Sequence, residues 1–432
     1  MKSHSPFALT VALILSFYSA NAQTSTGLET RPRTVSQTQQ PQQQVPASTN
    51  KAEIQPLGNP SDVRVNTSGA SVTTLAPVPV EERAPQLPTS FSPSTIRSRI
   101  AEAERLMKTR PQPTALTSPS IEFVTIAALD RATSRIHLFT VSKETFLKKN
   151  ADLSLISSQG MPVDLRILRA NGVNTAVTLT DAGGRALAPL VVEFPIEKGG
   201  VFREMAYYTS AHPALLSNDL TRSGQAYVRS MLDLAVKRLR EKGAFISPQI
   251  VDVAERLCLV EHVDHERFRA ENRLALYNEV YSLYALNELD TYRYSVSFAG
   301  AGGMVQMIPW AYNLIRQRHS GVGLTPDFVA GMRNHSNALQ AMLLYMQDTW
   351  NDLTASADVK AALDSKTATP AELMAAGYNS NAAKLPLYLR RGGDSWRTLI
   401  PRETQMYLQI YKSFESLVPL KLKAADSAEA IR

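Results

Sequence analysis

The sequence predicts an α+β protein of several domains, in which a small antiparallel β module precedes an all-α domain. Short runs of β-branched and aromatic residues recur between about residues 118 and 198, as is typical of strands. From roughly residue 212 onward, apolar residues recur instead at the spacing of amphipathic helices. Residues 23–90 contain nine prolines and no aromatic residue, so this stretch is not expected to form a core.

The first 22 residues have the features of a secretory signal peptide. A lysine at position 2 precedes an apolar run from Phe7 to Phe17, and the small-residue segment Ala20-Asn21-Ala22 follows as a cleavage site. No later stretch approaches the roughly twenty apolar residues that a membrane helix needs. We therefore expect an exported, periplasmic protein without a transmembrane segment, whose mature chain begins near Gln23.

Residues 23–93 are predicted to be a disordered linker, extended by its prolines, that tethers the folded part. The single cysteine, Cys258, excludes an intramolecular disulfide framework. The net charge of +7 suits a polyanionic neighbour such as a cell-wall polymer or a membrane surface, sooner than nucleic acid, but equally suits an ordinary solvated surface.

Residues 94–200 are predicted to form a short helix and an antiparallel β module that resembles a sandwich. Pro93 would begin the helix, whose apolar residues share one face: Ile96, Ile100, Ala103 and Met107. Asn171-Gly172 lies between two strand-like runs and predicts a hairpin, since both residues tolerate positive φ. The predicted strands span residues 123–126, 136–141, 163–168, 173–179 and 190–194. Because no catalytic constellation stands out here, binding or positioning is the expected role.

The helical domain, residues 210–420, carries clear helix boundaries. A predicted helix ends at Gly243, another begins at Ser247-Pro248, and Thr369 to Glu372 has the pattern of a capping box. Apolar and aromatic residues at helical spacing precede Glu288 and would place it at the end of an apolar stripe: Leu274, Tyr277, Tyr281, Tyr284 and Ala285. A carboxyl in such a setting holds its proton near neutrality and can act as a general acid. The alternative is a glutamate that points into water at a helix end.

Nine residues after Glu288, the segment from Ser297 to Pro309 reads S-F-A-G-A-G-G-M-V-Q-M-I-P. With this spacing the chain resembles the lytic transglycosylase family related to goose-type lysozyme, whose signature is a Glu, eight residues and S-x-A-G-A-x-G-x-x-Q-x-x-P. Two later blocks, Ala376 to Asn381 and Pro401 to Tyr407, resemble further family motifs. The resemblance covers about residues 248–414 and leaves the linker and the β module unexplained.

The resemblance implies a lysozyme-like catalytic domain that cleaves peptidoglycan glycan strands with neither a cofactor nor a metal. Glu288 would protonate the glycosidic oxygen between N-acetylmuramic acid and N-acetylglucosamine, then take the proton of the C6 hydroxyl, which leaves a 1,6-anhydro end. The substrate-binding residues that it implies are Ser297, Gln306, Tyr378, Asn379 and Glu403. The β module or the linker is a candidate contact for an envelope machine.

The residues also allow other interpretations. Ser297 and Gln306 could satisfy loop backbone groups, Tyr378 could be part of a core, and Glu403 could cap a helix. Leu289 stands where the family usually has Ser or Thr, which keeps open a non-catalytic glycan-binding or scaffolding protein. If water instead reached C1, the same residues would make a hydrolytic muramidase.

Two other groups compete with this site. Cys258, His262 and His265 lie at helical spacing and resemble a metal cluster, but they match no standard zinc pattern, so a charged helix end with a buried thiol is the preferred interpretation. Glu261 is a rival acid, but its distance along the chain to Ser297 differs from the family spacing.

Overall fold

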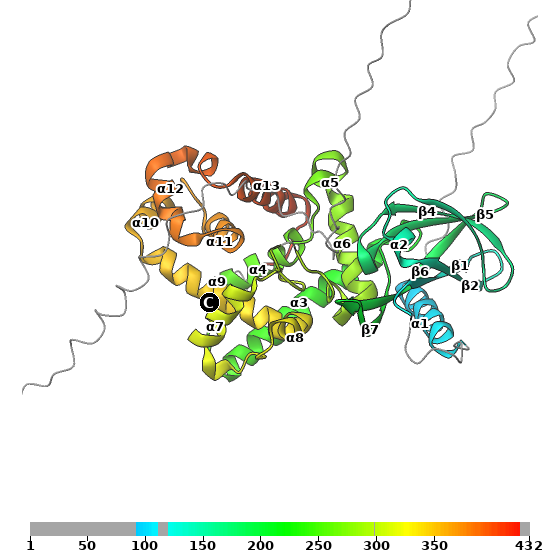
Figure 1. The fold of residues 1–432 in the computed structure, drawn as a ribbon. Coiled ribbons are helices and arrows are strands. Elements are labelled where there is room, and N and C mark those ends of the chain that lie inside the picture. The colour runs from blue at the N-terminus through cyan, green and yellow to red at the C-terminus, as the bar shows by residue number, and fades with distance from the viewer. Residues whose placement is uncertain (1–91, 111–119, 298, 424–432) are drawn as a thin grey trace, which may run out of the picture. The chain divides into compact units, whose positions relative to one another are not determined.

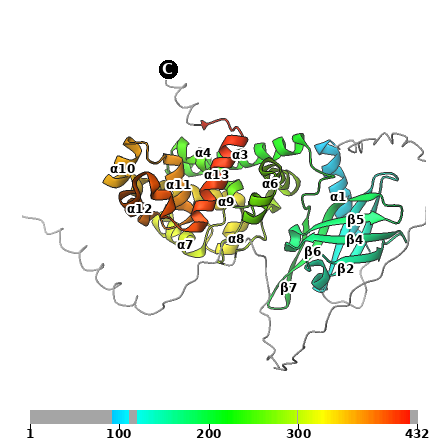
Figure 2. The same ribbon diagram turned by 90° about the horizontal axis from the view of Figure 1, so that it is seen from above.

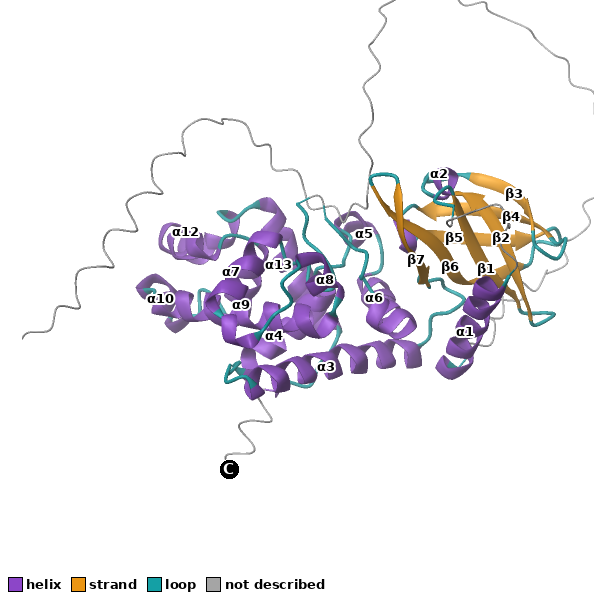
Figure 3. Ribbon diagram, turned by 60° about the horizontal axis from the view of Figure 1, so that its bottom comes forward, coloured by secondary structure: helices purple, strands orange, loops and turns teal. Residues whose placement is uncertain are grey.

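The computed structural model describes residues 92–110, 120–297 and 299–423 (Figure 1). The predicted signal peptide, almost all of the predicted linker and Phe298 of the signature lie outside these residues. The described chain is a mixed α/β protein that begins with one helix, continues with the strands and ends with eleven further α-helices (Figure 3). No helix among the described residues is long and apolar enough to cross a membrane.

The strands form one antiparallel sheet. Its order is β2-β1-β6-β5-β4-β3, with β7 paired to β6. The strands are β1 (Phe123–Asp130), β2 (Arg135–Ser142), β3 (Asp152–Ile156), β4 (Pro162–Arg169), β5 (Ala176–Asp181), β6 (Ala186–Lys198) and β7 (Val201–Tyr208). A short helix, α2 (Lys143–Phe146), follows β2. The sequence predicted five of these strands and missed β3 and β7.

The prediction of a sandwich is wrong, because the strands make a half-barrel from a single sheet. The long strand β6 is the reason. Its first residues, Ala186 and Leu187, pair with β5, its middle pairs with β1, and its end pairs with β7. The pairing shifts register between Ala127 and Ala128 and between Ile196 and Glu197, and bulges of this kind increase the local twist. A twisted sheet can enclose its own core without a second sheet.

The predicted hairpin at Asn171 is only partly confirmed. β4 and β5 do pair in antiparallel fashion, but a 3-10 turn from Gly172 to Asn174 joins them. Gly172 has a φ of 46°, whereas Asn171 has a φ of −153°. The connection is therefore longer than the two-residue turn that the dipeptide predicted.

The helix predicted at Pro93 is confirmed as α1 (Pro93–Thr109), capped by the Ser92 side chain. Its four predicted apolar residues are all buried, and they share a core with residues of β1 and β6, against which α1 lies (Figure 3). The same core contains Leu220, Ala285 and Leu286 from the helical region. The sheet, α1 and the helices are thus joined by continuous apolar packing.

The helical region begins with α3 and continues to α13. Its helices are α3 (Asn218–Glu241), α4 (Pro248–Val260), α5 (His265–Ala270), α6 (Arg273–Asn287), α7 (Pro309–Arg318), α8 (Phe328–Arg333), α9 (His335–Ala355), α10 (Ala357–Asp364), α11 (Pro370–Asn379), α12 (Leu385–Gly392) and α13 (Arg402–Leu417). The predicted boundaries are confirmed: Gly243 has a φ of 77°, Ser247 is the N-cap of α4, and Thr369 and Glu372 form a capping box.

The long helix α3 packs against α6 (Figure 2), and Gly224 is the point of closest approach. A Cβ atom at position 224 would lie 1.9 Å from the carbonyl oxygen of Tyr281. Only a residue without a side chain therefore permits this crossing.

We predict that Gly224→Ala lowers the free energy of unfolding by about 2 kcal/mol or more, because the added methyl group forces α3 and α6 apart. Chemical denaturation measures this loss. Gly321→Ala is the matched control, since an added Cβ there meets no heavy atom within 4 Å. Equal stability of the two variants would contradict the close crossing.

Candidate functional site around Glu288

The helix α6 is the support of the candidate site. Tyr277, Tyr281 and Tyr284 on this helix are almost wholly buried. The Tyr284 hydroxyl donates a hydrogen bond of 2.9 Å to the carbonyl oxygen of Cys258 in α4, and the Tyr277 hydroxyl donates one to Ile410 in α13. These contacts fix the rotation of α6 within the helical region.

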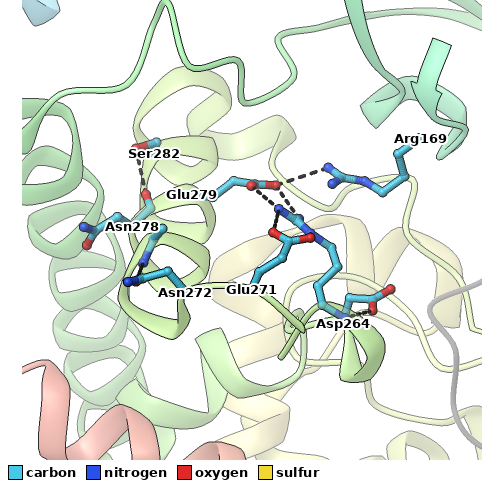
Figure 4. A network of polar contacts seen from close by, with 9 residues as sticks. Arg169, Asp264, Glu271, Asn272, Asn278, Glu279 and Ser282 are labelled. Atoms are coloured by element: carbon cyan, nitrogen blue, oxygen red, sulfur yellow. Dashed lines mark hydrogen bonds and ion pairs between the residues drawn. The ribbon is translucent and has the colours of Figure 1, made fainter. Parts of the chain in front are cut away.

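A partly buried ion-pair network ties the middle of α6 to the sheet (Figure 4). Glu279 of α6 accepts hydrogen bonds from Arg169, at the end of β4, and from Arg267 of α5, at 3.1 Å and 2.8 Å. Arg267 also binds Glu271. Although burial opposes it, the hydrogen bonds from Arg267 hold the pKa of Glu279 below its ordinary value. The Glu279 carboxylate therefore stays ionised and paired with Arg267 at neutral pH.

The last residue of α6, Asn287, is clamped to the chain that leaves β7. Its Oδ1 accepts a hydrogen bond from the backbone N–H of Thr209, and its Nδ2 donates one to the Thr209 carbonyl, both at 2.8 Å. The Asn287 side chain thus binds both backbone groups of Thr209, as a neighbouring strand would. The position of the residue after Asn287 is set by this pair of bonds.

Glu288 leaves the helix at this point. Its backbone has a φ of 47°, an uncommon conformation for a residue with a side chain. The expected apolar stripe therefore ends before it: Glu288 turns away, and its side chain is 59% exposed. The expectation of a poorly solvated carboxyl is wrong for the free protein, because the helix stops one residue too early.

The charged neighbour of Glu288 is Arg97 of α1. Arg97 Nη2 lies 3.9 Å from Glu288 Oε1 and also donates hydrogen bonds to Ser223 Oγ and to the carbonyl oxygen of Ala285. α1 thus brings a fixed cation to the candidate acid, which no sequence pattern predicted.

The segment after Glu288 is held by His335, the first residue of α9. The ring of His335 is buried, with Nε2 2.8 Å from the carbonyl oxygen of Thr291 and Nδ1 2.8 Å from the hydroxyl of Tyr227. Since a carbonyl only accepts, Nε2 carries the proton and Nδ1 accepts from Tyr227. Burial lowers the pKa of His335 to about 4. The ring is therefore neutral at ordinary pH.

Asp290 is a second carboxylate beside the site, and the sequence analysis missed it. Burial raises the pKa of Asp290, and Glu104 and Glu204 add to the rise, whereas Arg293 opposes it. Arg293 Nη1 lies 3.4 Å from Asp290 Oδ1. In the sequence, only its position two residues after Glu288 pointed to Asp290. Acidic residues near helix ends are common, so this position alone did not identify it.

The signature segment forms a compact turn. Two isolated β-bridges join Val296 to Gly302 and Gly302 to Met307. Ser297 Oγ accepts a hydrogen bond from the N–H of Ala301, and Gln306 Nε2 donates to the carbonyl oxygen of Gly303 at 2.8 Å. Both side chains are buried. Ser297 and Gln306 therefore satisfy backbone groups of the loop, which was the alternative interpretation of these two residues.

The far side of this turn is part of the helical core. Met304 and Val305 are fully buried. The Tyr378 hydroxyl donates a 2.6 Å hydrogen bond to the carbonyl oxygen of Val305, and His262 Nε2 lies 2.9 Å from that of Met304. Gly303 has a φ of 69°, and a Cβ there would lie 2.3 Å from the carbonyl oxygen of Met332. The glycine of the signature is thus a packing requirement.

The remaining predicted residues lie further along the helices. Asn379 is the last residue of α11, and its buried Oδ1 meets no hydrogen-bond partner among the described residues. Glu403 lies in the first turn of α13, where a carboxylate favours the helix N-terminus. The structure therefore joins Ser297, Gln306 and Tyr378 through the signature turn, while Glu403 has the place of a helix-start residue.

A cavity of about 870 Å³ lies where the sheet meets the helical region. Its walls include Ser295, Val296, Gly302 and Gly303 of the signature turn and its approach. Glu288 is absent from the residues that line it, as far as the chain is described. The candidate acid and the large cavity are neighbours along the chain, but they are separate features.

The structure also gives the positions of the competing residues. No set of three His, Cys, Asp or Glu residues in the described ranges could hold a metal ion. Cys258 is buried, and His262 points to the Met304 carbonyl. Glu261, the rival acid, is buried and accepts a 2.7 Å hydrogen bond from the Tyr407 hydroxyl.

Comparisons with protein-family models, with curated proteins and with solved structures found no match for this chain.

His335 is predicted to make the protein sensitive to acid. Its pKa is 6.5 when solvated and about 4 when folded, so between these values the unfolded chain binds more protons. The stabilising contribution is complete above about pH 6.5 and is lost as the pH falls toward about 4. From about pH 7 to about pH 5, we expect this residue to account for a loss of ~2 kcal/mol in unfolding free energy.

Denaturation of the wild type and of His335→Gln across this pH range measures the loss. Glutamine keeps an N–H donor for the Thr291 carbonyl but does not titrate. The variant should lose less stability on acidification than the wild type by about 2 kcal/mol. Identical pH dependence would show that His335 is not the acid-sensitive group.

Proposed function

We propose that this protein is a peptidoglycan lytic transglycosylase in which Glu288 is the acid and then the base. The observation that carries the proposal is an accessible carboxylate on a rigid support. Glu288 is 59% exposed, yet it directly follows the clamped Asn287 and precedes a tightly folded signature turn. The resemblance of that turn to the family adds the reaction class, and a lysozyme-like fold for the helical region is part of the same proposal.

The proposed reaction begins with transfer of a proton from Glu288 to the glycosidic oxygen between N-acetylmuramic acid and N-acetylglucosamine. As the bond from C1 to this oxygen breaks, the acetamido oxygen of the muramyl sugar stabilises the positive charge at C1. The ionised Glu288 then accepts the proton of the C6 hydroxyl while that oxygen bonds to C1. Glu288 ends protonated as it began, and no water is consumed.

The exposure of Glu288 means that the substrate itself must complete the site. A general acid holds its proton near neutrality when it is removed from water. A sugar ring over Glu288 would exclude water from the carboxyl, and Leu289, itself 60% exposed, offers an apolar surface beside it. The Arg97 guanidinium would then lie at the same sugar, where its charge can bind a carboxylate of the strand.

A second candidate is a glycan-binding protein without turnover. The observation that favours it is the ion pair of Glu288 with Arg97 on the surface, since a catalytic acid is more often enclosed. In this proposal the fold and the cavity would hold glycan, and no bond would break. A muramidase is the third outcome, in which water replaces the C6 hydroxyl.

The proposed location is the periplasm, where the substrate is found. This part of the proposal is based on the signal-peptide pattern of residues 1–22, which lie outside the described residues. The proposed partners are peptidoglycan strands, with the β module or linker as contacts for an envelope machine.

Digestion of purified peptidoglycan, followed by mass spectrometry, tests the proposal. The wild type should release fragments with 1,6-anhydro ends, and Glu288→Gln should lower the rate by about a hundredfold or more, because a positioned acid and base contributes roughly that factor. Glutamine keeps the size of the side chain, so stability should change little.

Asp290→Asn is the matched control, two residues away. It should retain most of the activity if Glu288 is the acid, whereas loss in Asp290→Asn with retention in Glu288→Gln would transfer the role to Asp290. Products with reducing ends would identify a muramidase. Binding of strands without any product would establish the non-catalytic alternative.

A further inference from the structure

The cavity at the junction of the sheet and the helical region has apolar surface that stays accessible to solvent. Val296 and Val329 line it and are 52% and 51% exposed. Ile196 of β6, Tyr294 and Phe328 also line it and keep part of their surface exposed. We call these five residues the junction surface. Exposed apolar residues that gather around one hollow, instead of lying singly, are typical of an interaction site.

The charged side chains around the junction surface are already paired. Lys143 Nζ lies 3.1 Å from Glu197 Oε1. Glu204 of β7 binds Arg333 and Arg293, at 2.5 Å and 3.4 Å. A charged ligand would have to compete with these ion pairs, whereas an uncharged apolar ligand leaves them intact.

The aromatic rings of the junction surface are held in place by the protein. The Tyr294 hydroxyl lies 3.3 Å from a carboxylate oxygen of Glu204, so the polar end of this side chain is engaged. The Phe328 ring packs edge-on against Tyr312, with 5.7 Å between the ring centroids. Grooves lined by aromatic rings bind proline-rich segments in the polyproline II conformation, because such segments are preformed and lose little entropy on binding.

One segment that precedes the folded part has this chemistry. Residues 75–80 read L-A-P-V-P-V, which is the only run of six residues without a polar side chain between positions 23 and 91. Ala76 and Val78 each precede a proline, which disfavours the helical conformation and favours polyproline II. The segment is uncharged and apolar, as the paired charges around the junction surface require.

Residues 75–80 are also close enough along the chain to reach the junction surface. Val80 lies twelve residues before Ser92, the N-cap of α1, and an extended chain of that length spans up to about 40 Å. Arg97 of α1 lies 3.9 Å from Glu288, and the chain reaches the cavity wall four residues later. The steps from Ser92 to the wall together cover no more than about 40 Å, so the connection is long enough.

We propose that the junction surface binds residues 75–80 of the same chain as an extended, proline-containing strand. The aliphatic side chains and prolines of this strand would cover Val296 and Val329 and remove their exposed apolar surface from water. The bound strand would fix the end of the predicted linker to the folded part, so that only the residues before position 75 act as a tether. This inference is independent of the reaction proposed for Glu288.

Fluorescence polarisation tests the proposal with a labelled peptide of residues 71–84 and the full chain without its predicted signal peptide. In the wild type, the attached segment competes with the added peptide at an effective concentration of about a millimolar. Val78→Asp with Val80→Asp puts two charges into the attached segment and should free the junction surface. We expect this double variant to bind the peptide at least about tenfold more tightly than the wild type does.

Further substitutions locate the binding. Val329→Asp, added to the double variant, puts a charge into the junction surface and should weaken peptide binding at least about tenfold. Val201→Asp is the matched control, because Val201 of β7 is 55% exposed and is not among the described residues that line the cavity. A peptide with Pro77→Ala and Pro79→Ala should also bind more weakly, since it loses the preformed conformation.

The proposal is overturned if the double variant does not bind the peptide, or if Val329→Asp leaves the binding unchanged. Equal binding by the wild type and the double variant would also overturn it, because the attached segment would then not occupy the junction surface. That result would instead make the surface a site for an apolar segment of another protein. A lack of peptidoglycan cleavage would reject the proposed reaction and leave these binding results unaffected.

Discussion

The pair of hydrogen bonds between Asn287 and Thr209 is the constraint on which the site depends. It stops α6 at Asn287 and joins that end to the chain leaving β7. Glu288 is the next residue and has a positive φ. The direction of its side chain therefore depends on the contact between the helix α6 and the chain that leaves β7. The same clamp places Thr291 for its bond to His335 and brings Arg293 toward Glu204.

The sheet and the helices are therefore one structural body around α6. Leu283 packs with the core of the sheet, while Ala285 and Leu286 pack with α1. Glu279 adds a partly buried ionic contact to Arg169 on the sheet side. This arrangement explains why a cavity lined by residues of both parts forms at the junction.

Local rules explain what the sequence predicted well. Pro93, Ser247 and Thr369 begin helices because caps and prolines act within one turn, and the glycines of the signature mark a close backbone turn. The setting of Glu288 was not predictable in this way. The end of α6 depends on Thr209, 78 residues away, and the neighbouring cation arrives on α1. Likewise β3 alternates between half-buried and exposed residues, so it lacks the apolar run that identified other strands.

The most direct measurement is a crystal structure of the Glu288→Gln protein with an uncleaved N-acetylated glycan strand. We predict that a glycosidic oxygen lies within about 3 Å of the side chain at position 288. A strand bound with position 288 free of sugar would contradict the role of Glu288 as the acid.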